Sequence, residues 1–408
     1  MSAVERLIRY CKIDTQSNPE SGTSPSSQKQ FDLANVLVEE LKEMGIEDAH
    51  VDEYCYVYGH LPANTDKNCK RIGFIAHMDT APDYTGTNVN PRIIENYDGG
   101  DIELCPGVVT RVDQFPQMKK LKGMDLVVTD GSTLLGADDK AGIVAIMETI
   151  EYLLSHSEVE HGPISIGFTP DEEIGEGPKH FNYEEFGADF AYTMDGGEIE
   201  VYSDETFNAA KATVKFQGFS IHPGSAKDKM INASNVAFEF HRLLPEYMRP
   251  EHTEGRDGFI HLGKMSGNTD QAELQYILRD HNRTKLEKQI ERMKDSVLYL
   301  NQIYGEGTVA IEIENSYRNM KEIIDQHPEV ARIAKEAIQE LGYVVECEAI
   351  RGGTDGAELS YHGLPCPNLG TGGGNFHGRY EYCCVQQLEQ ASQLIRLIVD
   401  KTLKETNL

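Results

Sequence analysis

Two adjacent aspartates, Asp138 and Asp139, are the first candidates for chemistry in this sequence. Residues 134–137 are typical of a strand end and a sharp turn, and apolar residues recur at helical spacing between 143 and 150. In open α/β sheets, ligand sites form outside the carboxyl ends of the strands. A carboxylate at such a position can bridge two cations. The alternative is an aspartate that caps the helix, followed by a solvated one.

Three further apolar runs, each predicted to be a buried strand, end in side chains of similar chemistry. The runs and the residues that follow them are 71–76 with His77 and Asp79, 162–168 with Asp171, Glu172 and Glu173, and 191–194 with Asp195. Alternating strands and helices predict a largely parallel sheet, whose carboxyl ends lie along one edge. We therefore expect all four groups of polar side chains to converge at that edge.

Each group also has a structural interpretation. His77 and Asp79 share one face of a strand, and a metal-binding histidine usually donates its second ring N–H to a carboxylate. A single histidine at a strand end is nevertheless more often structural. Three consecutive acids are costly to bury without a cation, but they can also form an acidic first turn that favours the dipole of the next helix. The coincidence of four such groups is what favours a metal site.

The pattern changes near residue 207. Predicted strands and helices then alternate, with a turn-rich stretch between them: strands 211–219, 273–280 and 308–314, helices 232–248 and 284–304, and turns in 254–270. This order suggests a split βαβ arrangement. We expect a smaller α+β domain of the ferredoxin-like type at 207–315, inserted into an α/β catalytic domain that is formed by 1–206 and 316–408.

Three residues outside the first half of the chain are further candidates. His222 and Arg279 belong to the inserted domain and have the chemistry to face a cleft. His377 lies in the glycine-rich loop 370–378, whose few bulky neighbours allow a ligand to approach closely.

The composition excludes several classes of partner. The chain has 408 residues with 67 acidic and 38 basic side chains, so its formal charge is −29. Nucleic acids and anionic membranes both need a basic face, so we expect neither as a partner. The N-terminal residues lack the apolar core of a signal peptide, and the eight cysteines form no CxxC pair. Both features favour reduced thiols and a cytoplasmic protein.

Together the motifs resemble those of the M20 family of co-catalytic zinc peptidases, and they occur in the same order. They are His77-Met78-Asp79, Gly136-Ala137-Asp138-Asp139-Lys140, Asp171-Glu172-Glu173, Asp195-Gly196-Gly197 and Asn375-Phe376-His377-Gly378. Segments 351–356 and 169–173 narrow the resemblance to the tripeptide aminopeptidases of that family. The similarity runs essentially from end to end of the chain.

The resemblance implies a ligand set for two zinc ions. His77 and Asp195 would bind one ion, and Glu173 and His377 would bind the other. Asp138 would bridge the two ions. Imidazole and carboxylate ligands also suit cobalt or manganese as substitutes.

The resemblance further implies the catalytic roles. Glu172 would be the general base, Asp79 would orient His77, and Asp139 would follow a cis peptide bond. Two ions ~3.5–4 Å apart can hold a water between them and lower its pKa towards ~7, which supplies the nucleophile. His222 is our candidate donor to the oxyanion, in its own site or a neighbouring subunit's. Arg279 is our candidate for the carboxylate of the peptide.

The expected reaction is release of the N-terminal residue from a tripeptide. The nearer alternative is another M20-type hydrolase with the same metal core, such as an N-acyl amino acid deacylase or a dipeptidase. The remoter one is a non-catalytic peptide- or metal-binding protein, which predicts loss of a ligand or of Glu172, and the sequence retains all of them. We expect a small peptide as substrate and a homodimer formed through the inserted domain.

Overall fold

The computed structural model describes residues 1–405, which divide into two compact units. Unit 1 contains Met1–Asp204, Glu322–Glu348 and the described residues from Thr354 onward, and unit 2 contains Glu205–Lys321 and Ala349–Gly353. The predicted boundaries differ from these by a few residues and leave residues 349–353 out of the inserted part. This short segment joins unit 2 through backbone hydrogen bonds, from Ile350 N to Glu205 O at 2.8 Å and from Phe207 N to Gly352 O at 3.2 Å. A role of unit 2 as a lid or dimerisation domain stays a prediction.

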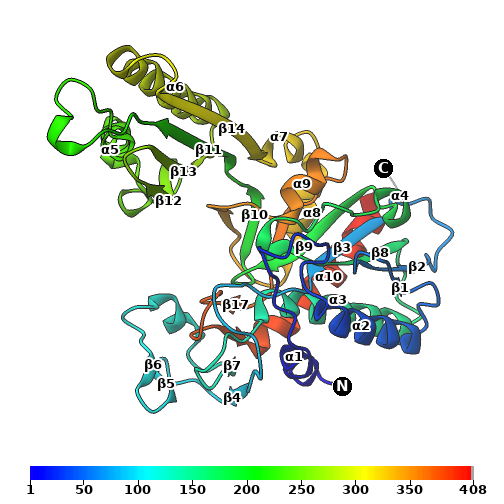
Figure 1. Cartoon of the computed structure of the whole chain (residues 1–408). Coiled ribbons are helices and arrows are strands. Elements are labelled where there is room, and N and C mark those ends of the chain that lie inside the picture. Colours follow the sequence, from blue (N-terminus) through cyan, green and yellow to red (C-terminus); the bar gives the residue numbers. More distant parts are fainter. Residues whose placement is uncertain (406–408) are drawn as a thin grey trace. The chain divides into compact units, whose positions relative to one another are not determined.

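An eight-stranded mixed sheet forms the centre of unit 1, with the order β1-β2-β8-β3-β9-β16-β10-β15 (Figure 1). Its strands are β1 (His50–Val51), β2 (Val57–Leu61), β3 (Ile72–His77), β8 (Ile164–Thr169), β9 (Phe190–Gly196), β10 (Val201–Glu205), β15 (Glu346–Ala349) and β16 (Asn368–Gly370). β8, β3, β9 and β16 run parallel, whereas β1, β2 and β10 pair antiparallel. The predicted α/β class with a mixed sheet is confirmed.

The central strands are apolar on both faces because helices cover both. One face packs against α1 (Ala3–Cys11), α2 (Gln30–Met44), α3 (Ala137–Ser155), α8 (Pro328–Glu340) and α10 (Val385–Glu405). The other face packs near α4 (Tyr183–Phe186) and α9 (Asp355–Tyr361). Along β3 the two faces alternate, with Phe74 and Ala76 in the first cluster and Ile75 in the second.

Smaller elements complete unit 1. One four-stranded sheet has the order β17-β18-β7-β4, with β17 (Gly373–Gly374), β18 (Tyr382–Cys384), β7 (Leu126–Val128) and β4 (Arg92–Ile94). A hairpin is formed by β5 (Ile102–Cys105) and β6 (Val108–Thr110), and a short helix α7 (Lys321–Ile324) lies at the boundary of the units. The strand predicted just before Asp138 is therefore wrong, because β7 ends at Val128 and belongs to this smaller sheet.

Unit 2 is an antiparallel four-stranded sheet with two helices, in the order β12-β13-β11-β14. The elements are β11 (Asn208–Gln217), α5 (Ala233–Leu243), β12 (Phe259–Gly267), β13 (Gln271–Asp280), α6 (Arg283–Tyr304) and β14 (Val309–Tyr317). α5 and α6 pack against the apolar face of the sheet (Figure 1). This βαββαβ order is the predicted ferredoxin-like arrangement.

Two predicted details of unit 2 are wrong. β12 occupies the stretch predicted to be turns, because it is an exposed edge strand whose glycines and polar residues conceal the alternation. The helix predicted at 232–248 ends at Leu243, since Pro245 restricts the residue before it to an extended conformation. Its start is as predicted: Asn232 caps α5 by accepting hydrogen bonds from the N–H groups of Ser234 and Asn235.

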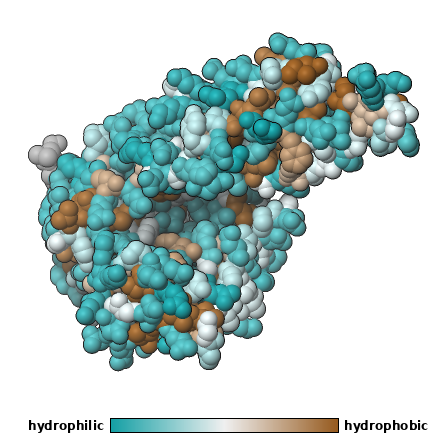
Figure 2. Space-filling view, turned by 90° about the vertical axis from the view of Figure 1, so that its left-hand side faces the viewer, coloured by the Kyte–Doolittle hydropathy of each residue, from teal (hydrophilic) through white to brown (hydrophobic). Residues whose placement is uncertain are grey.

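The surface reflects the acidic composition. The face in Figure 2 is covered mostly by hydrophilic residues, with separate hydrophobic patches. No helix within residues 1–405 combines the length and the apolar character that crossing a bilayer requires.

Candidate dinuclear metal centre

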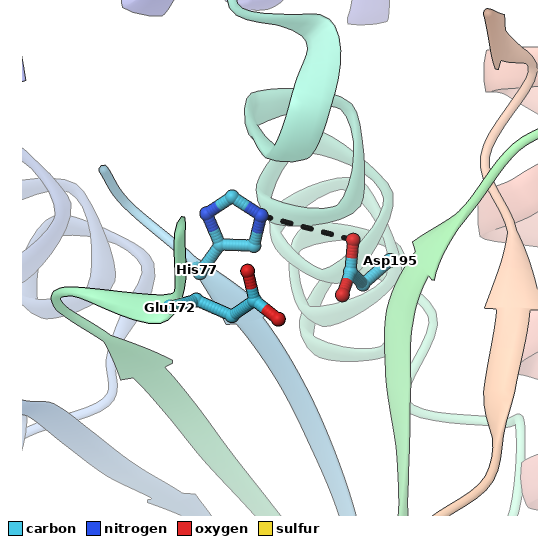
Figure 3. A group of neighbouring side chains, drawn as sticks. All are labelled: His77, Glu172 and Asp195. Carbon is cyan, nitrogen blue, oxygen red and sulfur yellow. Dashed lines mark ion pairs between the residues drawn. The ribbon is translucent and has the colours of Figure 1, made fainter. Parts of the chain in front are cut away.

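His77 and Asp195 stand at the carboxyl ends of the neighbouring parallel strands β3 and β9. The His77 Nε2 atom lies 3.7 Å from Asp195 Oδ1 and 2.9 Å from Asp138 Oδ1. In Figure 3, His77, Asp195 and Glu172 point toward one common space. One ligand atom from each of these three side chains lies within 4.8 Å of the others, which is close enough for all of them to surround one ion.

A second cluster adjoins the first through Asp138. His77, Asp138 and Glu173 also place their ligand atoms within 4.8 Å of one another. On the far side, His377 Nε2 lies 2.9 Å from Glu173 Oε2 and 3.3 Å from Asp138 Oδ2. The two oxygens of Asp138 therefore face different histidines, as a bridging carboxylate must. The five predicted ligands come together in unit 1.

Asp79 lies beneath the candidate ligands and contacts the residues that carry them. It is fully buried, and its Oδ1 atom lies 3.3 Å from His77 Nδ1. The same carboxylate accepts hydrogen bonds from the N–H groups of Glu172 at 3.0 Å and Glu173 at 3.2 Å. Asp79 thus contacts both the histidine that we expect it to orient and the short 3-10 turn Glu172–Ile174.

Asp139 has a different task from Asp138. The peptide bond between them is cis, as the resemblance implied. Asp139 is buried, and its carboxylate accepts hydrogen bonds from the N–H of His77 at 3.2 Å and of Gly142 at 3.1 Å. It therefore joins the start of the regular part of α3 to the end of β3, while Asp138 faces the histidines.

Other buried carboxylates hold the loops that carry the candidate ligands, and sequence reasoning missed their roles. Asp171 has a left-handed backbone, and its carboxylate accepts from Ser26 N at 2.7 Å and Gln30 Nε2 at 2.6 Å. Glu381 accepts three backbone hydrogen bonds from residues 135–138. The sequence offered a weak signal only for Glu381, which stands between Tyr380 and Tyr382 before two cysteines.

Burial and the close charges shift the pKa values of the histidines and glutamates in this site. The hydrogen bonds to Asp138 and Glu173 raise the pKa of His377 to about 11. Burial favours a neutral His77 ring, but its bonds to Asp138, Asp195 and Asp79 prevail and raise the pKa of His77 well above its usual value. Burial raises the pKa of Glu172 well above normal and, with the nearby Asp138, raises that of Glu173 to about 7. A bound cation would counter these shifts, because its positive charge stabilises ionised carboxylates.

The residues present fit metal binding. The Oε1 atom of Glu173 is buried and has no hydrogen-bond partner, although an unpaired buried oxygen is costly. A divalent cation would satisfy it. The donor set of imidazole nitrogen and carboxylate oxygen suits zinc and its neighbours in the first transition row.

The remaining predicted residues, His222 and Arg279, belong to unit 2. His222 is exposed, and its Nδ1 accepts a hydrogen bond from Gly224 N at 3.1 Å. Arg279 lies on β13 with its guanidinium 4.6 Å from the ring centre of Tyr317. Its Nη1 atom is buried without a hydrogen-bond partner. The roles of both residues at the site stay predictions.

Comparison with known proteins shows the family to which this chain belongs. Residues 126–401 match peptidase family M20/M25/M40. The chain is also 51% identical over 398 residues to "Peptidase T" of Geobacillus thermodenitrificans, and the match covers 97% of each sequence. The chain belongs to family M20/M25/M40. Membership of this peptidase family confirms the predicted enzyme class, a hydrolase of peptide bonds.

Two solved peptidase structures share the fold. Aminopeptidase PepT from Bacillus cereus aligns with a TM-score of 0.77 at 22% identity, covering 98% of both chains. A tripeptidase from Staphylococcus aureus aligns with a TM-score of 0.78, also at 22% identity and 98% coverage of both chains. Both units are therefore part of a fold that these two proteins share, since the alignments cover nearly the whole chain.

The position of Asp138 between the two histidines leads to a first prediction. Asp138→Ala should abolish peptide hydrolysis and reduce the bound zinc below two ions, because two close cations repel each other strongly without an anion between them. Zinc content after equilibrium dialysis and the turnover of a tripeptide measure both effects. Asp52→Ala is a matched control, since Asp52 also accepts backbone N–H bonds but contacts none of the candidate ligands. Full activity of Asp138→Ala with two bound zinc ions would contradict the bridging role.

Proposed function

We propose that this chain is a metallo-aminopeptidase that releases the N-terminal residue from tripeptides. The observation that carries the proposal is the convergence of two imidazoles and three carboxylates at one end of the unit 1 sheet, with Glu172 beside them. Membership of a peptidase family supports the reaction. The names of the relatives, "Peptidase T", aminopeptidase PepT and a tripeptidase, support the substrate class.

The same proposal assigns two zinc ions to five residues. His77 and Asp195 hold one ion, Glu173 and His377 hold the other, and Asp138 is shared, which agrees with its two oxygens facing different histidines. Cobalt or manganese can substitute for zinc. When bound, the ions supply a nucleophile from water at neutral pH and polarise the scissile carbonyl.

Glu172 moves the proton. Its carboxylate points into the same space as His77 and Asp195 (Figure 3). Its backbone N–H donates a hydrogen bond to Asp79 Oδ1 at 3.0 Å. Burial makes its carboxyl group a stronger base than an exposed glutamate, because the charged form is poorly solvated. Glu172 accepts the proton of the attacking water and then donates it to the amine that leaves.

The two ends of the substrate need separate groups. Arg279 has an unpaired buried nitrogen and a planar fork that matches a carboxylate, so we assign it to the peptide's C-terminus. His222 is exposed and mounted on a short turn, and we assign it to the oxyanion, in its own subunit or in a neighbour.

The proposal also covers the oligomeric state, the partners and the location of the enzyme. Several large apolar side chains of α5 and α6 are exposed, namely Phe238, Leu298, Tyr299 and Ile303. They support a homodimer through unit 2, because α5 and α6 pack against each other and exposed apolar surface is typical of protein contacts. The charge of −29 argues against nucleic acid and membrane as partners, and we place the enzyme in the cytoplasm.

A panel of peptides tests the reaction and the role of Arg279 together. The zinc-loaded protein should cleave tripeptides with a free N-terminus faster than di- and tetrapeptides, and it should not cleave N-acetylated ones. Arg279→Ala should raise the KM for tripeptides and weaken the bias against tetrapeptides, because the carboxylate is no longer held at a fixed distance.

Arg283→Ala is the control for that variant, since Arg283 is an exposed arginine of the same unit that pairs with Glu287. Preferential hydrolysis of N-acetylated substrates would indicate a deacylase instead. An unchanged length preference in Arg279→Ala would exclude Arg279 from the substrate site.

The adjacent glutamates give a prediction that separates a base from a ligand. Glu172→Gln keeps the shape but cannot take up a proton, so it should retain both zinc ions while kcat falls by roughly 10²–10⁴. Glu173→Gln should instead lose zinc, because a neutral amide oxygen is a poorer ligand than a carboxylate. Metal content and kcat of the two variants, each serving as the other's control, decide the matter. The assignments must be exchanged if Glu172→Gln loses zinc and Glu173→Gln keeps it.

A further inference from the structure

Glu381 is a buried acid that the proposed reaction does not use. Only 1% of its surface is exposed. Its Oε2 atom accepts hydrogen bonds from Leu135 N at 2.7 Å and Gly136 N at 2.8 Å, and its Oε1 atom accepts one from Asp138 N at 3.0 Å. Hydrogen bonds to a charged acceptor are stronger than neutral ones, and together three of them offset much of the cost of burying a carboxylate.

These three donors belong to the loop that presents Asp138. Residues 134–136 lie outside the sheets: Leu134 N bonds to Thr85 O at 3.0 Å, and the N–H groups of Leu135 and Gly136 bond to Glu381 rather than to a strand partner. The Glu381 carboxylate takes the place of such a partner. Because one of the bonds comes from Asp138 itself, Glu381 ties the Asp138 backbone to its own loop, while the adjacent Asp139 ties the turn to the end of β3.

Glu381 also belongs to the loop that presents His377. It follows His377 by four residues, and its N–H bonds to Gly378 O at 3.2 Å. The loop is held further by Asn375, whose side-chain amide donates to Tyr380 O at 3.2 Å. Immediately after Glu381, Tyr382 begins β18 and pairs with Val128 of β7. The Glu381 side chain thus connects the loop that carries Asp138 with the loop that carries His377. The two candidate ligands approach each other closely, with His377 Nε2 3.3 Å from Asp138 Oδ2.

The other candidate site is held in a different way. His77 and Asp195 stand at the ends of β3 and β9, which pair directly in the main sheet. His77 is fixed again by Asp79 and by Asp139, the latter through its backbone N–H. The sheet therefore fixes the first pair of ligands, whereas the distance between His377 and Asp138 depends on contacts between loops.

We propose that Glu381 is a positioning residue that sets the spacing of Asp138 and His377 and so controls metal binding at the site of Glu173 and His377. The proposal rests on the ligand assignment of the proposed function. It assigns no contact between Glu381 and a metal ion or a substrate.

The substitution Glu381→Gln tests the proposal because it replaces one of the two accepting oxygens by a donor. The amide can still accept from the 135–136 side, but its NH₂ group then faces the N–H of Asp138. We expect zinc affinity at one of the two sites to fall by about 10–100-fold, the usual effect of changing a group that positions a ligand. Activity should return at high zinc concentration, which a purely structural defect would not allow. Competition with a chromophoric chelator measures both dissociation constants.

A double variant identifies the affected site. His377→Ala should retain a single zinc ion, and adding Glu381→Gln to it should change the affinity for that ion by no more than about twofold, the scatter expected for independent effects. A tenfold loss in the double variant would mean that Glu381 acts on Asp138 for both sites, and it would overturn the proposal. So would unchanged zinc affinity in Glu381→Gln.

Two further variants distinguish a specific effect of Glu381 on zinc binding from a general effect of altering a buried carboxylate. Asp52→Asn alters a carboxylate that also binds backbone N–H groups, and it should leave both zinc affinities unchanged. If Glu381→Gln does not fold, Glu381→Asp keeps the charge but is too short to reach both ends of the 135–138 segment, and the same zinc loss is expected. Zinc binding is measured without substrate, so a wild-type protein that binds two zinc ions but cleaves no peptide would contradict the proposed function and leave this test intact.

Discussion

The structure depends on one electrostatic constraint, the packing of several acids against each other at the end of a sheet. Asp138, Glu172, Glu173 and Asp195 share this space with His77 and His377. Carboxylates this close repel each other in a poorly solvated site. The raised pKa values of Glu172, Glu173 and Asp195, each due first to burial, express this conflict. Cations are the simplest way to resolve it.

The acids that surround this group are held in another way. Asp79, Asp139, Asp171 and Glu381 each accept at least one backbone N–H bond from a strand or loop at the site. These bonds oppose the cost of burial, although burial still raises the pKa of Asp139 and Asp171 and raises that of Glu381 to about 7. The candidate ligands instead face histidines, with Thr354 also donating to Asp195 Oδ2 at 3.3 Å, and Glu173 Oε1 has no hydrogen-bond partner. Backbone N–H bonds therefore distinguish the supports from the candidate ligands more clearly than position in the sequence does.

Sequence reasoning could predict the ligand-bearing strand ends because each is a local pattern. The apolar runs that became β3, β8 and β9 are buried along most of their length, and the residues that follow them converge as the parallel arrangement requires. The βαββαβ unit was also predictable, although its edge strand β12 was not, since an exposed edge has little hydrophobic periodicity. The strand expected before Asp138 was wrong because two buried leucines, Leu134 and Leu135, pack equally well from a loop.

Two supports of the site, Asp171 and Glu381, could not be predicted, since their roles depend on long-range pairing. Glu381 binds residues more than 240 positions earlier in the chain, as its separation of 243 from Asp138 shows. Asp171 binds Gln30 across 141 positions. No local pattern specifies such partners, and an isolated acid in a sequence is more often a solvated one.

The central claim is that one carboxylate, Asp138, is shared by two metal ions. The most direct measurement is anomalous diffraction at the zinc absorption edge from crystals of the zinc-loaded protein. The account predicts two zinc peaks ~3.5–4 Å apart, the usual spacing of two-metal sites, with the Asp138 carboxylate between them. A single peak at full occupancy, or two peaks of which only one contacts Asp138, would contradict it.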